Sequence, residues 1–165
     1  MNESWLSVPG WVGYYEVSDQ GRVRSLSRSV TEPSGRTQHH AGRVLRPGTG
    51  DQGYSVVVLS GDGVKKSQAV HVLVLTAFVG PRPNGLVTRH GNGVKSDNRA
   101  VNLRWGTRTE NAYDAVRHGQ HPMSKRTTCP RGHPYTHRDA RQRRCRTCIR
   151  TRNKQPHTNQ KKALA

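Results

Sequence analysis

The sequence has a single Phe among its 165 residues, and hydrophobic residues make up only 31% of it. So small an apolar fraction argues against one large core, and the length suits one or two small domains. No apolar run approaches the ~20 residues that a helix needs to span a bilayer. The first ten residues lack the basic start and the apolar stretch of a secretory signal. We therefore expect a cytoplasmic protein.

Acidic residues are also scarce. Ten Asp and Glu stand against 28 Lys and Arg, which gives a net charge of +18 and an isoelectric point near 11.2. An excess of this size destabilises the folded chain by self-repulsion unless a polyanion meets it. The charge therefore indicates nucleic acid as the partner, although charge alone does not distinguish DNA from RNA.

One stretch is organised around a histidine. A short apolar run ends at His90, a Gly- and Asn-rich loop follows, and a second strand-like run covers Val101–Trp105. Thr107 and Glu110 then have the spacing of a capping box, in which each side chain accepts a hydrogen bond from a backbone N–H of the first helical turn. The sequence therefore predicts strand, loop, strand and helix, with His90 facing Asn111 across a small cleft.

The order and spacing of His90, Asn102 and Asn111 resemble the ββα-metal core of HNH nucleases, particularly the phage homing endonucleases of that group. The upstream segments GYYEVS and GRVRSL resemble the nuclease-associated module that often precedes such cores. The resemblance implies an α+β fold with a small β-rich module over residues 1–42 and a nuclease core over residues 43–119. It also implies a phage- or mobile-element-encoded protein that acts in a bacterial host cell.

The same resemblance implies a metal-dependent DNA endonuclease that nicks one strand per active site. Phosphodiester hydrolysis needs a water deprotonated near neutral pH, and a neutral imidazole has a suitable pKa, so His90 is the expected general base. Asn102 is expected to hold the loop through side-chain to backbone hydrogen bonds, with Asn98 as the alternative for that role. Asn111 is the expected ligand of a catalytic Mg²⁺ or Mn²⁺, which prefers oxygen.

One position departs from the family pattern. In better studied relatives the residue before the catalytic His is a metal-binding Asp, whereas here it is Arg89, which has no lone pair to offer a cation. Three interpretations are open. The metal is held by Asn111, the scissile phosphate and waters; Arg89 itself clamps the phosphate; or the site is degenerate and the protein binds DNA without cutting it.

The N-terminal region contains two strand-like runs separated by residues 18–21, which have turn chemistry and predict a hairpin. Arg22 and Arg24 occupy alternate positions, so their side chains should share one face of the second strand. That face either contacts DNA or is simply solvated. Residues 27–42 are polar, include Pro and Gly, and are expected to form a flexible loop with two solvated histidines.

Further strands are predicted at residues 43–45, 54–59 and 64–70, with a Gly-Asp-Gly turn between the last two. The apolar segment that follows fits both a helix and a strand by its periodicity. The resemblance favours a short buried helix, near whose start His71 is expected to pack or form a hydrogen bond.

The composition changes near the C-terminus. Residues 121–165 contain 13 Lys and Arg against one acid, and so carry +12 of the net charge. We predict a zinc knuckle or ribbon-like segment over residues 120–150, like the small zinc-binding tails seen after some HNH cores. A disordered basic tail is expected over residues 151–165 because that segment is polar and has no periodicity.

All three cysteines lie in this C-terminal region. Cys129 is followed by His133, and after eleven residues by Cys145 and Cys148. This Cys₃His set has the count of a tetrahedral structural Zn²⁺ site. The alternative of a disulfide leaves one Cys unpaired and needs an oxidising compartment.

Arginines are the expected contacts to a double-stranded DNA partner. Those predicted to bind phosphates are Arg22, Arg24, Arg104, Arg108, Arg138, Arg141, Arg143, Arg144 and Arg146. A homodimer or a phage protein as a further partner is an open alternative, and so is an RNA-binding zinc protein.

Overall fold

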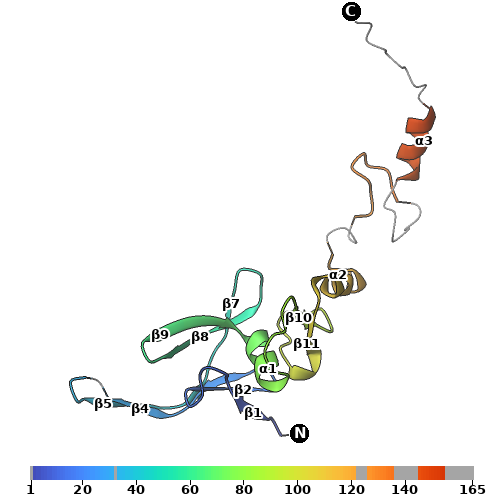
Figure 1. Cartoon of the computed structure of the whole chain (residues 1–165). Coiled ribbons are helices and arrows are strands. Elements are labelled where there is room, and N and C mark those ends of the chain that lie inside the picture. The colour runs from blue at the N-terminus through green and yellow to red at the C-terminus, as the bar shows by residue number, and fades with distance from the viewer. Residues whose placement is uncertain (1, 32, 122–125, 136–144, 155–165) are drawn as a thin grey trace, which may run out of the picture. The chain divides into compact units, whose positions relative to one another are not determined.

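The computed structural model describes residues 2–31, 33–121, 126–135 and 145–154 (Figure 1). The chain divides into two units, Met1–His118 and Gly119–Ala165. Among the described residues, no helix has the length and apolarity to cross a bilayer.

The N-terminal sheet has four antiparallel strands in the order β1-β2-β3-β6. Their bounds are Trp5–Ser7 for β1, Tyr15–Ser18 for β2, Val23–Ser25 for β3 and Arg43–Val44 for β6. The predicted hairpin is confirmed as β2–β3. Its turn contains Gly21, whose φ of 80° and close approach to Asn98 both exclude a side chain, because an added Cβ would lie 2.8 Å from the Asn98 Cβ. The turn is therefore packed against the loop that follows His90.

The prediction of a flexible loop over residues 27–42 is wrong. Strands β4 (Arg28–Thr31) and β5 (Thr37–His40) pair antiparallel into a two-stranded ribbon. The two threonine hydroxyls nearest the turn lie 2.9 Å apart across the strands. Pro33 and Gly35 lie only in the turn between the strands, whereas the Thr, Val and Ser residues on either side of it pair across the ribbon.

A second hairpin leads into the first helix. Strands β7 (Gly48–Thr49), β8 (Ser55–Gly61) and β9 (Val64–Ala69) form an antiparallel sheet, in which the β8–β9 hairpin is as predicted. Asp62 and Gly63 between them have φ values of 48° and 74°, the backbone that a tight hairpin turn requires. Figure 1 shows β9 leading directly into α1 (Val70–Phe78), the helix that the resemblance favours.

The predicted strand, loop, strand and helix are present. Strand β10 (Val87–His90) pairs antiparallel with β11 (Leu103–Gly106), and α2 (Arg108–Arg117) follows. The second strand begins two residues later than predicted because Ala100–Asn102 forms a short 3₁₀ helix, η1. The capping box is confirmed: Thr107 Oγ1 accepts from the Glu110 N–H at 3.2 Å, and the Glu110 carboxylate accepts from the Thr107 N–H at 2.7 Å.

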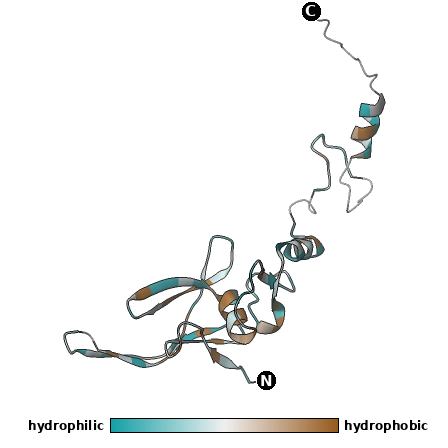
Figure 2. Ribbon diagram, in the orientation of Figure 1, coloured by the Kyte–Doolittle hydropathy of each residue, from teal (hydrophilic) through white to brown (hydrophobic). Residues whose placement is uncertain are grey.

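One hydrophobic core joins these elements. It combines side chains of β2, β3, β8, α1 and β11, and Figure 2 shows hydrophobic residues gathered on α1. Its largest fully buried side chains include Leu59 and Leu75. The two modules predicted for residues 1–42 and 43–119 thus share a core, and the boundary between them stays a prediction.

The second unit contains α3 (Arg146–Lys154) and a bridge between Thr128 and Pro134. Helix α3 includes the first four residues of the predicted disordered tail, so for residues 151–154 that prediction is wrong. The Thr151 hydroxyl donates to the Thr147 carbonyl at 2.9 Å, one helical turn back. The rest of the predicted tail, residues 155–165, lies outside the described residues.

Candidate active site and metal centre

His90 is the last residue of β10, and only 7% of it is exposed. Its Nε2 lies 3.4 Å from the Asn98 Oδ1, at the long end of hydrogen-bonding distance. A proton on Nε2 is the one that can be donated to this oxygen, and it leaves Nδ1 free to accept a proton. Burial lowers the pKa of His90 below its ordinary value and so favours the neutral ring.

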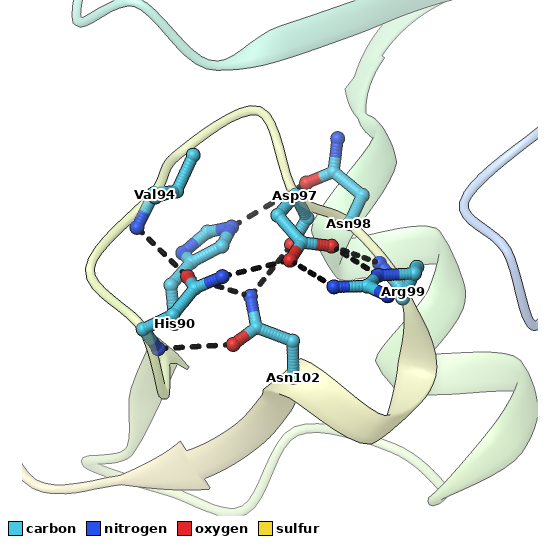
Figure 3. A network of polar contacts seen from close by, with 7 residues as sticks. His90, Val94, Asp97, Asn98, Arg99 and Asn102 are labelled. Atoms are coloured by element: carbon cyan, nitrogen blue, oxygen red, sulfur yellow. Dashed lines mark hydrogen bonds and ion pairs between the residues drawn. The ribbon is translucent and has the colours of Figure 1, made fainter.

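Asn102 closes the loop that follows His90 (Figure 3). Its Oδ1 accepts from the Asn92 N–H at 3.0 Å, and its Nδ2 donates to the Asn92 Oδ1 at 3.0 Å and to the Asp97 carbonyl at 2.8 Å. Asn98 contacts His90 instead. Asn98 and Asn102, the two candidates for holding the loop, thus make different contacts. Those of Asn102 fit the predicted role.

The carboxylate of Asp97 shapes the same loop. It accepts hydrogen bonds from the Arg99 guanidinium at 2.8 and 2.7 Å and from the Asn92 Nδ2 at 2.7 Å. The hydrogen bond from Arg99 is the main cause that lowers the pKa of Asp97 to about 2. All of these bonds are local, and they hold the loop that Asn102 closes.

Arg89 points to α2. Its Nε donates to the Asp114 Oδ2 at 2.8 Å, its second terminal nitrogen lies 2.7 Å from the same oxygen, and its first lies 2.9 Å from the Glu110 Oε1. The side chains of Arg89 and Asp114 are only 12% and 6% exposed. Gly106 makes room for this arrangement, because a Cβ there would collide with the Arg89 Cδ. The arginine therefore ties β10 to α2.

Asn111 lies in the first turn of α2 and is exposed. It offers one amide oxygen to a cation. The carboxylates on either side of Asn111 along the helix, Glu110 and Asp114, are engaged by Arg89. A divalent ion here would have few ligands from the protein. The donor set fits an ion such as Mg²⁺ that keeps several waters and takes the rest of its ligands from substrate phosphate.

Two segments of the first unit match known protein families. Residues 68–113 match the HNH endonuclease family, and residues 3–60 match the NUMOD4 motif. The chain carries an HNH endonuclease domain. Nucleases of this family generally use divalent metal ions.

Relatives of known name support the same assignment. The DNA endonuclease I-HmuI of Bacillus phage SP01 is 31% identical over 121 residues, which are 73% of this chain and 62% of that protein. An uncharacterized HNH endonuclease, L247 of Acanthamoeba polyphaga mimivirus, is 30% identical over 129 residues, covering 76% of this chain and 29% of that one. The chain thus spans about three fifths of the phage relative.

A solved structure of DNA binding and cleavage by the HNH homing endonuclease I-HmuI also matches. The TM-score is 0.56 at 31% identity, over 71% of this chain and 60% of that chain. The expected α+β fold, with N-terminal strands before an HNH core, is confirmed.

Upstream of the HNH domain, Arg22 and Arg24 share a face as predicted, since both guanidinium groups lie over the Trp5 ring, at 5.7 and 4.2 Å from its centroid. Each is also paired with a carboxylate, Arg22 with Glu3 and Arg24 with Glu16. Their predicted contact with DNA would have to compete with these pairs.

The other predicted DNA contacts are distributed over both units. Arg104, Arg108 and Arg146 are exposed, whereas Arg138, Arg141, Arg143 and Arg144 lie outside the described residues.

The four residues of the Cys₃His set come together in the second unit. The ligand atoms of Cys129, His133, Cys145 and Cys148 all lie within 4.8 Å of one another. The Cys129 and Cys148 sulfurs are 3.8 Å apart, and the His133 Nδ1 lies 3.6, 3.8 and 3.2 Å from the three sulfurs. Ligands around a tetrahedral zinc would be about 3.8 Å apart for two sulfurs and about 3.6 Å for sulfur and nitrogen. The set fits a divalent metal.

The thiols of this set do not ionise equally. The Cys148 N–H donates to the Cys145 sulfur, which is the main cause that lowers the pKa of Cys145 to about 7. Burial is the main cause that raises the pKa of Cys148 to about 11. A bound cation would stabilise all three thiolates together. A metal site with three cysteine ligands requires all three in this form.

Sequence reasoning missed one residue next to His90. The Tyr54 ring is stacked on the His90 ring, with 5.9 Å between centroids and 26° between planes. Tyr54 precedes β8 and lies far from His90 along the chain. Local spacing carries no signal for such a contact, which depends on how the β8–β9 hairpin packs.

Proposed function

We propose that this chain is a divalent-metal-dependent DNA endonuclease that hydrolyses phosphodiester bonds and nicks one strand per active site. The observation that supports it most is the geometry of His90 inside an HNH domain: the ring is buried, and its Nε2 faces the Asn98 Oδ1, so that with a proton on Nε2 the Nδ1 can accept another. DNA as substrate is supported by the net charge of +18 and by the name of the phage relative, a DNA endonuclease.

In this proposal His90 Nδ1 accepts the proton of the attacking water, and general base catalysis of this kind is worth about 100- to 10,000-fold in rate. A bound Mg²⁺ or Mn²⁺ would supply charge stabilisation at the phosphate and the leaving oxygen. Asn111 would be its protein ligand. Asn102 keeps the loop closed so that His90 and its surroundings hold one geometry.

Arg89 can add positive charge at the phosphate. Its contacts with Asp114 and Glu110 use one donor on each of its three nitrogens, and a guanidinium has five. Glu110 is 52% exposed, so one of the two anchoring carboxylates is accessible to solvent. We assign Arg89 a phosphate contact made while it remains bound to Asp114.

The C-terminal unit would raise the affinity for DNA. Zn²⁺ in the Cys₃His set would fold a short segment that carries many arginines, and each phosphate contact releases counterions. The phage relative supports a protein that works inside a bacterial host cell. Double-strand cleavage by a homodimer, or with a phage protein as partner, is an extension of the proposal.

Incubation of supercoiled plasmid with the protein and Mg²⁺ or Mn²⁺ tests the function. The wild type should give nicked circles, and the His90→Ala variant should be slower by about 100- to 10,000-fold. His39→Ala changes an exposed histidine of β5 and is the matched control. Absence of nicking in every divalent ion, or His90→Ala nicking as fast as wild type, would show the proposal to be wrong. Direct appearance of linear plasmid would indicate a dimer.

A second candidate function is DNA binding without cleavage. The observation that favours it is Arg89, which departs from the metal-binding Asp of the family pattern described above and is engaged by Asp114 and Glu110. A protein that binds DNA with a steep salt dependence, but nicks plasmid in none of the ions, would have this function.

A further inference from the structure

Two rings, those of Tyr54 and His71, lie next to the proposed base, His90. The Tyr54 ring lies 4.7 Å from His71 and 5.9 Å from His90, and the two imidazoles are 5.4 Å apart with 75° between their planes. His71 and His90 are 8% and 7% exposed. The rings come from three separate parts of the fold: the segment before β8, the first turn of α1 and the end of β10.

The two neighbours of His90 also make contacts that do not involve its ring. His71 belongs to α1, whose residues Val70 and Leu73 are part of the buried core. Among the described residues nothing bonds to the His71 Nδ1, so packing and not a hydrogen bond at this atom sets the position of the ring.

Tyr54 is fixed by one contact within its own segment and by one with the loop that follows His90. The Gly50 N–H donates to the Tyr54 carbonyl at 2.8 Å, which closes the turn before β8. The Lys95 ammonium lies 4.9 Å from the centroid of the Tyr54 ring and donates to the Gln52 carbonyl at 2.7 Å. The loop after His90 is thereby tied to the turn that carries Tyr54.

These contacts restrict how the His90 ring can turn. Tyr54 covers one face, the His71 ring meets it at a steep angle, and Asn98 faces Nε2. A histidine at the end of a strand would otherwise exchange among several rotamers. With the ring confined, Nδ1 points in one direction, and a displacement of about 1 Å at a reacting group can cost about 100-fold in rate.

We propose that Tyr54 and His71 are positioning residues that hold the imidazole of His90 in its reactive orientation. This inference rests on the proposed function, in which His90 is the base. His71 suits such a place because burial lowers its pKa to about 4, so it stays uncharged beside a ring that must accept a proton.

Single-turnover nicking at saturating plasmid tests the proposal. Tyr54→Ala should slow nicking by up to about 100-fold while the Kd for plasmid stays unchanged. Tyr54→Phe keeps the ring and should nick close to the wild-type rate. Tyr113→Ala removes an exposed tyrosine of α2 and is the matched control. A Tyr54→Ala rate equal to that of the control would overturn the proposal.

Nitrogen-15 NMR of the histidine side chains in the intact protein gives a readout that does not depend on cleavage. In the wild type His90 should show one tautomer, with the proton on Nε2, and in Tyr54→Ala and His71→Phe a mixture of tautomers. If the wild type does not nick, the proposed function fails, and the NMR spectra still decide whether these residues orient His90. Unchanged His90 signals in both variants would contradict the inference.

Discussion

The two units of this protein differ in what holds them together. In the first, Leu59, Leu75 and several valines are fully buried in one core that crosses the N-terminal sheet, α1 and β11. In the described part of the second, the buried residues are Cys129 and Cys145, both members of the Cys₃His set. Packed apolar side chains surround the site in the first unit, whereas in the described part of the second unit the buried side chains are themselves candidate metal ligands.

This difference has a consequence for where each unit is vulnerable. The side chains around His90 come from segments spread over the first unit. A destabilising substitution in the core of that unit should therefore disturb the site indirectly. The Cys₃His set depends on four side chains and on few apolar contacts. Loss of one ligand or of the metal should therefore unfold the segment around it. The two units should therefore fail separately.

The largest effect should come from the metal set. Zinc binding supplies about 10 to 16 kcal/mol to folding in small fingers, so Cys145→Ser or removal of zinc by a chelator should unfold the second unit. Metal analysis should find about one zinc per wild-type chain and none in the variant. NMR spectra should lose the dispersed signals of α3 and keep those of the first unit. A Cys145→Ser protein that retains its metal and α3 would contradict the comparison.

A core substitution should have the opposite selectivity. Leu75→Ala removes a fully buried side chain of α1 and should lower the free energy of unfolding of the first unit by about 2 to 5 kcal/mol. Urea unfolding followed by tryptophan fluorescence measures it, because all three tryptophans lie in this unit. Zinc content should not change. Loss of zinc from Leu75→Ala would show that the units are coupled.

A smaller effect is expected at the start of α2. Thr107→Ala removes the cap that accepts from the Glu110 N–H and should destabilise the first unit by about 0.5 to 2 kcal/mol. Thr107→Ser retains the hydroxyl and is the control. Equal unfolding midpoints for Thr107→Ala and wild type in the same urea titration would mean that the cap does not contribute.

The last prediction concerns how the stability of the first unit depends on pH, an effect that is smallest just below pH 6.5. The pKa of His71 is about 4 in the folded chain against an ordinary value of 6.5, so between these values the unfolded chain binds a proton that the folded chain does not. Stability of the first unit should therefore fall as the pH falls from 6.5 to 4. Thermal unfolding at several pH values should show a flatter slope for His71→Phe. An unchanged slope would exclude His71 as the source.

Local chemistry made several elements predictable from the sequence. The Thr107 and Glu110 capping box, the Asp62-Gly63 turn and the β2–β3 hairpin each depend on residues a few positions apart. The prediction of a loop over residues 27–42 is wrong because turn residues describe only the turn, whereas strand pairing across it determines the structure of the segment. The start of β11 was missed for a related reason, because η1 follows from the closed loop around Asn102 and not from strand propensity.

By itself the sequence predicted the Cys₃His set, the histidine at the end of the first strand of the HNH domain and the asparagines that accompany it, since each follows from order and spacing along the chain. The tertiary structure alone decided that Arg89 is bound by Asp114 and Glu110, that Asn98 faces the imidazole, and that Tyr54 covers it. Spacing determines which side chains can meet within a turn or a hairpin. Contacts between distant segments depend on how the whole core packs.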